Sequence, residues 1–192
     1  NSEPGRHWHP SARLIAESTG PLKRDVCYLS SDPADPGLAP DDPRRHGFAI
    51  GDGLIRTVAF QFLQTRVALM TMIDLHNLQL KRSIYPVHYV FMFHSLISTH
   101  MADFAESYDH YDTILCAGPH QAREIRAREA QAGLPAKRLV PHGYHRVEQL
   151  MAAAAARAPR PPHDPPHVLL APSWGEETIL NRCGEPLCET LL

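Results

Sequence analysis

The feature that most constrains the fold is the alternation of short apolar runs with segments of helical pattern. The clearest case lies at residues 88–124, where the run at 89–93 is apolar, β-rich and of strand length. His94 follows this run directly, and a second apolar run at 111–117 ends at Gly118. Because strands that alternate with helices pair in parallel, we expect an α/β domain built on a doubly wound parallel sheet.

The same alternation continues along the chain. We expect strands at 24–31, 46–50, 67–73, 88–93, 111–117 and 137–141. We expect helices at 53–65, near 97–107, at 120–132 and at 145–158. The proline-rich stretch at 159–166 is typical of a linker, and a new apolar run starts after it. We therefore predict a first domain at 1–158, a linker at 159–166, and at 167–192 the first βα unit of a second, similar domain.

Composition excludes several classes of protein. The net charge of −2 gives no support to a nucleic-acid partner. No apolar run is long enough to span a bilayer, and no signal-peptide pattern opens the chain. The four cysteines are scattered, which favours a reducing cytoplasmic compartment without disulfides: Cys27, Cys116, Cys183 and Cys188. Since the chain lacks an initiator methionine and stops inside an apolar helical pattern, we expect it to be part of a longer protein.

Thirteen histidines raise the question of a metal site. The closest pairs are His7 with His9 and His142 with His145. Neither pair has carboxylate or cysteine partners at the spacing that a zinc site requires. We therefore predict no metal.

His94 stands where an open α/β sheet places its chemistry, beyond the carboxyl end of a strand and close to a helix N-terminus. Imidazole as a class titrates near neutral pH, and the positive end of a helix dipole favours anions. The combination suits proton removal beside an anionic substrate. The alternative is a histidine that only caps the following helix or hydrogen-bonds a loop.

Three segments resemble the CDP-glycerol glycerophosphotransferase family, which makes polymers of the teichoic-acid type with two Rossmann-like domains that face a cleft. The segment at 93–100, FHSLISTH, resembles the family's strand-end histidine motif. The segment at 111–125, YDTILCAGPHQAREI, resembles its strand followed by a helix over the cleft. The third match is HGYHRVEQL followed, after the linker, by VLLAPSWG, which resembles the crossing between the two domains.

The resemblance implies an enzyme, a two-domain transferase of the GT-B type, with CDP-glycerol as donor substrate and no cofactor. It implies transfer of glycerol phosphate to a hydroxyl of a lipid-linked glycerol-phosphate or related polymer, with release of CMP. Such an enzyme of cell-wall synthesis would work in the cytoplasm, as a peripheral protein at the inner face of the membrane. The reaction needs a base, fixed positive charge and alignment of two substrates, and His94 is the predicted base.

The predicted substrate-binding residues lie at several strand ends and loops. Lys81 and Arg82 are adjacent cations in one loop, which suits a phosphate-bearing acceptor if that loop folds over the cleft, although such pairs are often simply solvated. His100 lies about one helical turn beyond His94. Backbone N–H groups of a following helix would bind an anion near Gly118 and Ser173.

Ser95 is also a predicted substrate-binding residue, and it departs from the family pattern. The commoner pattern is Trp-His-Gly-Thr, whereas this chain has Phe93, His94, Ser95 and Leu96. Glycine lets a backbone approach a phosphate closely, so a serine there narrows that approach. The family's nucleotide-binding residues also lie mostly in the second domain, so we expect this chain to lack the complete donor site and to be inactive alone.

Two other functions are compatible with these observations. A nucleotide-sugar glycosyltransferase or epimerase would share the two-domain layout, because the fold alone does not fix the reaction. A non-catalytic domain that binds a polymer or a partner protein is favoured by Ser95 and by the incomplete second domain.

Overall fold

The computed structural model describes residues 25–39, 43–73, 75–77, 80–101 and 104–157, together with 169, 171, 181–184 and 186. The chain divides into two compact units, Asn1–Glu148 and Gln149–Leu192, and the division falls inside helix α4 (His145–Ala155). The predicted linker and most of the predicted second domain lie outside the described residues, so those two predictions stay untested.

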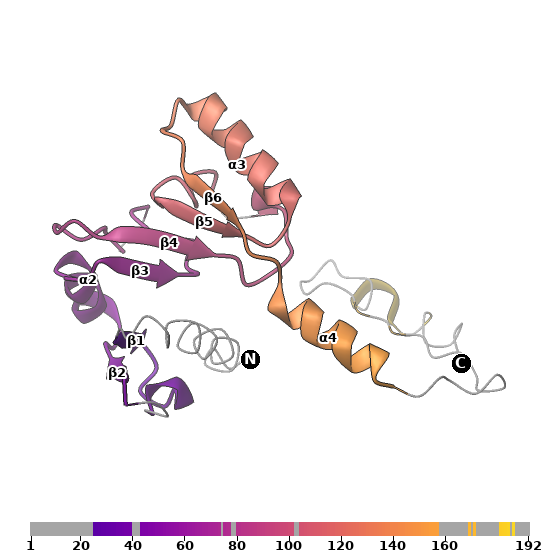
Figure 1. Ribbon diagram of the computed structural model, residues 1–192, viewed down its shortest axis with the longest axis horizontal. Helices are drawn as coiled ribbons and strands as arrows, with labels where there is room; N and C mark the ends of the chain where they lie inside the picture. Colours follow the sequence, from indigo (N-terminus) through magenta and orange to yellow (C-terminus); the bar gives the residue numbers. More distant parts are fainter. Residues whose placement is uncertain are drawn as a thin grey trace. The chain divides into compact units, whose positions relative to one another are not determined.

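A four-stranded parallel sheet forms the centre of the first unit (Figure 1). Its strands, in spatial order, are β3 (Val67–Met70), β4 (His88–Met92), β5 (Thr113–Cys116) and β6 (Arg138–Pro141). All three pairings are parallel, which confirms the predicted α/β class. Each strand lies beside the next one in the chain, so the order does not reverse within this sheet. The doubly wound arrangement therefore stays a prediction.

The first two strands pair with each other in a second, smaller sheet. β1 (Val26–Ser30) and β2 (Arg45–Ala49) are parallel, and their connection contains the 3₁₀ turn η3 (Pro36–Leu38). Asp35 organises this connection, since its carboxylate accepts hydrogen bonds from the Tyr28 hydroxyl at 2.8 Å and from the Gly37 N–H at 2.7 Å. The buried Arg45 guanidinium donates to the Gly37 carbonyl oxygen. Both strands lie where the apolar pattern predicts them.

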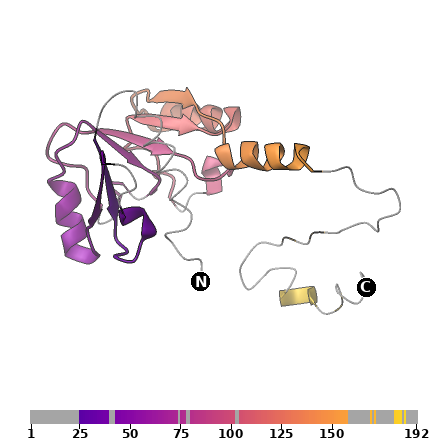
Figure 2. The same ribbon diagram turned by 60° about the horizontal axis from the view of Figure 1, so that its bottom comes forward.

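Helix α3 (Pro119–Ala132) connects β5 to β6 and lies beside β5 on one face of the sheet (Figures 1 and 2). Proline is well suited to the first helical turn, where its missing N–H is not needed. The helix ends at Gly133, whose φ of 62° is the left-handed conformation that glycine adopts at little cost. This helix, which the sequence places at 120–132, is confirmed.

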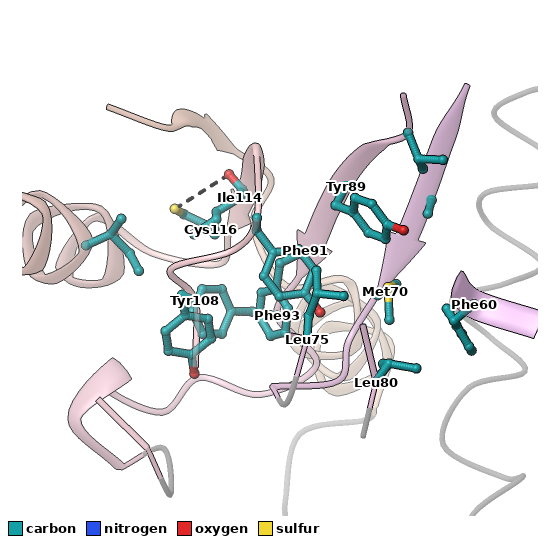
Figure 3. Packing of buried hydrophobic residues seen from close by; sticks show 14 residues of the cluster. Phe60, Met70, Leu75, Leu80, Tyr89, Phe91, Phe93, Tyr108, Ile114 and Cys116 are labelled. Carbon is teal, nitrogen blue, oxygen red and sulfur yellow. Dashed lines mark hydrogen bonds between the residues drawn. The ribbon is translucent and has the colours of Figure 1, made fainter. Parts of the chain in front are cut away.

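The core lies on the face of the sheet that carries α3. Every second side chain of β4 belongs to it, and two of these are the aromatic residues Tyr89 and Phe91 (Figure 3). Phe91 lies at the centre, with ring centroids 4.9 Å from Phe93, 5.0 Å from Tyr108 and 5.2 Å from Tyr111. Edge-to-face contacts of this kind are favourable beyond the burial of apolar area. These contacts fix the face of β4 that carries Phe91, and with it the register in which the strand reaches His94.

Two predicted helices differ from the structure. α2 (Gly53–Gln61) ends four residues before the predicted 65, and it buries Phe60 while Leu54 and Ile55 remain exposed. The predicted helix near 97–107 is wrong in the residues described. Only the 3₁₀ turn η4 (Thr99–Met101) and a series of turns from 104 onward are found there. The reason is that side chains of α3 bind the polar groups of this segment.

Candidate functional site

The ends of four parallel strands place several predicted site residues on one side of the sheet. We call this side the carboxyl edge and define it by residues 71–72, 93–98, 117–119 and 142–144, which follow β3, β4, β5 and β6 in turn. His94, Ser95 and Gly118 all lie there. The structure thus brings together three of the residues that the sequence singles out.

His94 combines an exposed side chain with a main chain held on both sides. Before it, Phe93 is only 4% exposed, and its N–H donates to the Leu115 carbonyl oxygen at 3.5 Å. At His94 itself, the carbonyl oxygen accepts a hydrogen bond of 2.7 Å from the Tyr144 hydroxyl. A rigid backbone that presents an exposed side chain is what a functional residue requires.

Gln121 fixes the loop that follows His94. Its side chain is fully buried at the start of α3, and its Oε1 accepts from the Ala117 N–H at 2.8 Å. Its Nε2 donates to the carbonyl oxygens of Ile97 at 3.0 Å and Ser95 at 3.5 Å. These carbonyls would otherwise accept the hydrogen bonds of a local helix, so Gln121 helps to explain why no such helix forms.

Glu124 holds the next part of the same loop. Its carboxylate accepts from the Thr99 N–H at 2.7 Å, the Thr99 hydroxyl at 2.8 Å and the Ser98 hydroxyl at 2.9 Å. Burial acts to raise the pKa of Glu124, but these hydrogen bonds and the charge of His100 outweigh it, so the pKa lies below its ordinary value. A charged Glu124 therefore anchors η4, and exposed His100 belongs to the turn that it anchors.

Gly118 caps the N-terminus of α3 with extended backbone. A Cβ atom at this position would lie 2.8 Å from the imidazole of His120, so the absence of a side chain lets His120 lie against the start of the helix. The first backbone N–H groups of α3 have no partner within the helix, which is the general basis of anion binding at such a position.

Arg82 lies at the opposite, amino edge of the sheet, so the condition attached to its predicted role, a loop folded over the site, is not met. Its guanidinium binds the Asp112 carboxylate at 3.0 Å and the carbonyl oxygens of His110 and Val87. It also lies over the Tyr89 ring at 4.6 Å from the centroid. The reason is topological, because a chain that enters a parallel strand must first return to the amino edge. Arg82 precedes β4 by only six residues.

The remaining predicted residues differ in their placement. Lys81 is exposed on the same side as Arg82, where its Nζ donates to the His76 carbonyl oxygen at 3.2 Å. Ser173 lies outside the described residues. Among the residues that the structure describes, no three histidine, cysteine, aspartate or glutamate side chains group in a way that could hold a metal ion. Of the helices in this part of the chain, none is both long and apolar enough to cross a membrane.

Sequence reasoning missed three residues that shape the site, namely Gln121, Glu124 and Tyr144. Gln121 and Glu124 stand three apart, on one face of the first turns of α3. Polar residues on the sheet-facing side of a helix that begins beside a strand end are a usable signal. Tyr144 belongs to the His-Gly-Tyr turn that carries part of the family resemblance, but nothing local in the sequence indicates its partner.

Comparisons with protein-family models, curated proteins and solved structures found no match to this chain. The resemblance to the glycerophosphotransferase family therefore stays a prediction.

Proposed function

We propose that the chain carries the acceptor-side domain of a two-domain, GT-B-type CDP-glycerol glycerophosphotransferase, with His94 as its general base. The observation that supports this proposal is the exposed imidazole of His94 on a main chain held by Tyr144 and, through the following loop, by Gln121. A base must be placed within hydrogen-bond reach of the proton that it removes, and a fixed main chain restricts where the imidazole can go.

In the proposed reaction, His94 accepts the proton of an acceptor hydroxyl. The oxygen attacks the β-phosphorus of CDP-glycerol, and the bond from that phosphorus to the oxygen bridging to the α-phosphorus breaks. CMP leaves with the bridging oxygen, while the acceptor gains glycerol phosphate through a new oxygen–phosphorus bond. Stabilisation of the phosphoryl oxygens requires donors or positive charge. The N–H groups in the first turn of α3, which begin at His120 because Pro119 has none, are suited to this role.

The other predicted contacts divide by position. Ser95 and His100 belong to the loop segment anchored by Gln121 and Glu124, so they are retained as proposed acceptor contacts. Arg82 is not retained, because its hydrogen bonds are used within the protein at the amino edge. Lys81 shares its side of the sheet and is not retained either. The donor-binding groups, Ser173 among them, belong to the proposed second domain.

The proposed acceptor is a lipid-linked polymer of glycerol phosphate or a related unit. An enzyme with this acceptor would act as a peripheral protein at the cytoplasmic face of a membrane, in cell-wall polymer synthesis. This part of the proposal is supported by the family resemblance alone.

The test is CMP release from CDP-glycerol by a protein that contains this chain together with a complete donor domain. We expect His94→Ala to lower kcat by a factor of about 10²–10⁴, the usual contribution of a general base. His46→Ala is the matched control, since His46 is an exposed histidine on β2, outside the four-stranded sheet.

Each outcome distinguishes between the candidate functions. Retained transfer in His94→Ala would exclude His94 as the base. Turnover of a UDP-sugar in place of CDP-glycerol would indicate a glycosyltransferase or epimerase. Binding of the polymer without turnover of any donor would indicate a non-catalytic domain.

A further inference from the structure

The turn after β6 is tied to the end of the neighbouring strand. The N–H groups of His142 and Gly143 both donate to the Cys116 carbonyl oxygen, at 2.9 Å and 3.4 Å. Gly143 has a φ of 77°, in the left-handed region that favours glycine, and this turn sends the chain across the carboxyl edge. The position of the next residue, Tyr144, is therefore set by β5 and β6 together.

From this turn, the Tyr144 hydroxyl donates a hydrogen bond of 2.7 Å to the carbonyl oxygen of His94, fifty positions away in the sequence. We propose that Tyr144 is a positioning residue for His94, which holds the direction of the imidazole by fixing the peptide plane behind it. The proposal rests on the proposed function in that it assigns Tyr144 a part in the same reaction.

The geometry favours tyrosine for this task. A phenol has only two side-chain torsions, so ordering it costs little conformational entropy compared with longer polar side chains. The peptide between His94 and Ser95 is fixed on one side by Tyr144, and Gln121 fixes the Ser95 carbonyl on the other. A free rotation of this peptide would swing the bond from Cα to Cβ of His94.

Tyr144 also directly precedes α4, the helix in which the first compact unit ends. The tie therefore makes the orientation of His94 depend on the segment that leads out of this unit. Neither the base role of His94 nor the family resemblance implies this dependence.

The direct test is NMR of the 192-residue chain with Tyr144→Phe, which removes only the hydroxyl. We expect the carbonyl ¹³C shift of His94 to change and the proton and carbon shifts of its imidazole to change with it. The matched control is Tyr111→Phe, because the Tyr111 hydroxyl donates to the Met72 carbonyl oxygen at the end of β3. That variant should shift the Met72 carbonyl and leave both His94 signals in place.

The second readout is kinetic, in the longer protein with a donor domain. We expect Tyr144→Phe to lower kcat about threefold to tenfold, the range that corresponds to one net hydrogen bond, with the KM for CDP-glycerol unchanged. In a His94→Ala background, Tyr144→Phe should not lower kcat further, because Tyr144 acts through the His94 imidazole and this background lacks it.

Two results would overturn the proposal. One is an unchanged imidazole spectrum of His94 in Tyr144→Phe, which would make the bond a purely structural tie. The other is an equal loss of kcat in the presence and absence of the His94 imidazole. If CDP-glycerol is not turned over at all, the proposed function fails, whereas the NMR comparison still decides whether Tyr144 positions His94.

Discussion

The two edges of the four-stranded sheet use their polar side chains in opposite ways. At the amino edge, Arg82 directs its guanidinium into the protein, to the Asp112 carboxylate, two carbonyl oxygens and the Tyr89 ring. At the carboxyl edge, the hydrogen bonds from Gln121 and Tyr144 hold main-chain atoms, and the His94 side chain is exposed.

The difference shows how to separate a structural polar residue from a candidate functional one. A cation whose hydrogen-bond donors are bound to acceptors inside the protein has few donors left for a ligand, whatever its charge. A residue whose main chain is fixed and whose side chain is exposed presents that side chain to solvent from a set position. The following changes test this contrast between the edges.

The largest effect on stability is expected from Arg82→Met at the amino edge. The change leaves Asp112 without its charge partner, although this carboxylate also binds the Tyr89 N–H at 2.7 Å. Because Arg82 and Asp112 are about one third exposed, at 30% and 34%, we expect the free energy of unfolding to fall by about 2–3 kcal/mol rather than by the larger loss of a buried pair. Urea unfolding followed by circular dichroism measures it.

The adjacent cation is the matched control for that measurement. Lys81 is exposed and has one hydrogen bond of 3.2 Å, so Lys81→Met should change the free energy of unfolding by less than about 0.5 kcal/mol. Equal effects at the two positions would mean that the internal bonds of Arg82 do not stabilise the amino edge.

A smaller loss is expected from Gln121→Leu in α3. Leucine would leave the Ala117 N–H and the Ile97 carbonyl without their bonds, at a cost of about 1–2 kcal/mol. Amide hydrogen exchange at Ala117 should speed up as the loop after His94 loosens. Gln131→Leu is the control, since Gln131 is an exposed residue of the same helix. Unchanged exchange at Ala117 would contradict the role assigned to Gln121.

The pH dependence of stability tests the amino edge again. Burial lowers the pKa of His110 below its ordinary value of 6.5, with further lowering by the nearby His76, whose ring centroid is 4.7 Å away. Arg82 and Lys137 act in the same direction, and Asp109 opposes them. Below pH 6.5 the unfolded chain then binds more protons than the folded chain, so stability falls as the pH is lowered.

His110→Gln should remove part of the loss of stability between pH 7.5 and 5.5. His76→Gln should reduce this loss less, because the charge of His76 is only the second cause of the lowered pKa of His110, after burial. Urea unfolding at the two pH values measures the slope. An unchanged slope in His110→Gln would show that the histidine pair is not a source of the acid sensitivity.

Much of the first unit follows from the apolar pattern, since all six predicted strands in the described residues are found. The helix near 97–107 failed for a physical reason. The groups that bind its backbone, Gln121 and Glu124, come from a helix more than twenty residues later in the chain, and no local pattern encodes that competition. Propensity is a weak prior where tertiary contacts compete for the same carbonyls.

The site residues that follow directly from strand ends could be predicted from the sequence. The hydrogen bonds between residues far apart in the chain could not. His94 and Gly118 follow apolar runs, so topology alone places them on one edge. The placement of Arg82 was also within reach, because a loop residue just before a parallel strand must lie at its amino end. The hydrogen bond from Tyr144 to His94 could not be predicted, since the two residues are fifty positions apart in the sequence.

The smallest effect on stability is expected from His94→Ala. This variant is the most direct test of the difference between the two edges of the sheet. An exposed side chain away from the core usually changes the free energy of unfolding by no more than about 0.5 kcal/mol. The main chain of residue 94 keeps its bond from Tyr144 in this variant, so the loop should stay in place. A loss near that of Arg82→Met would show that the imidazole is itself a structural group. The carboxyl edge would then differ from the amino edge only in position, and the case for His94 as a base would lose its structural support.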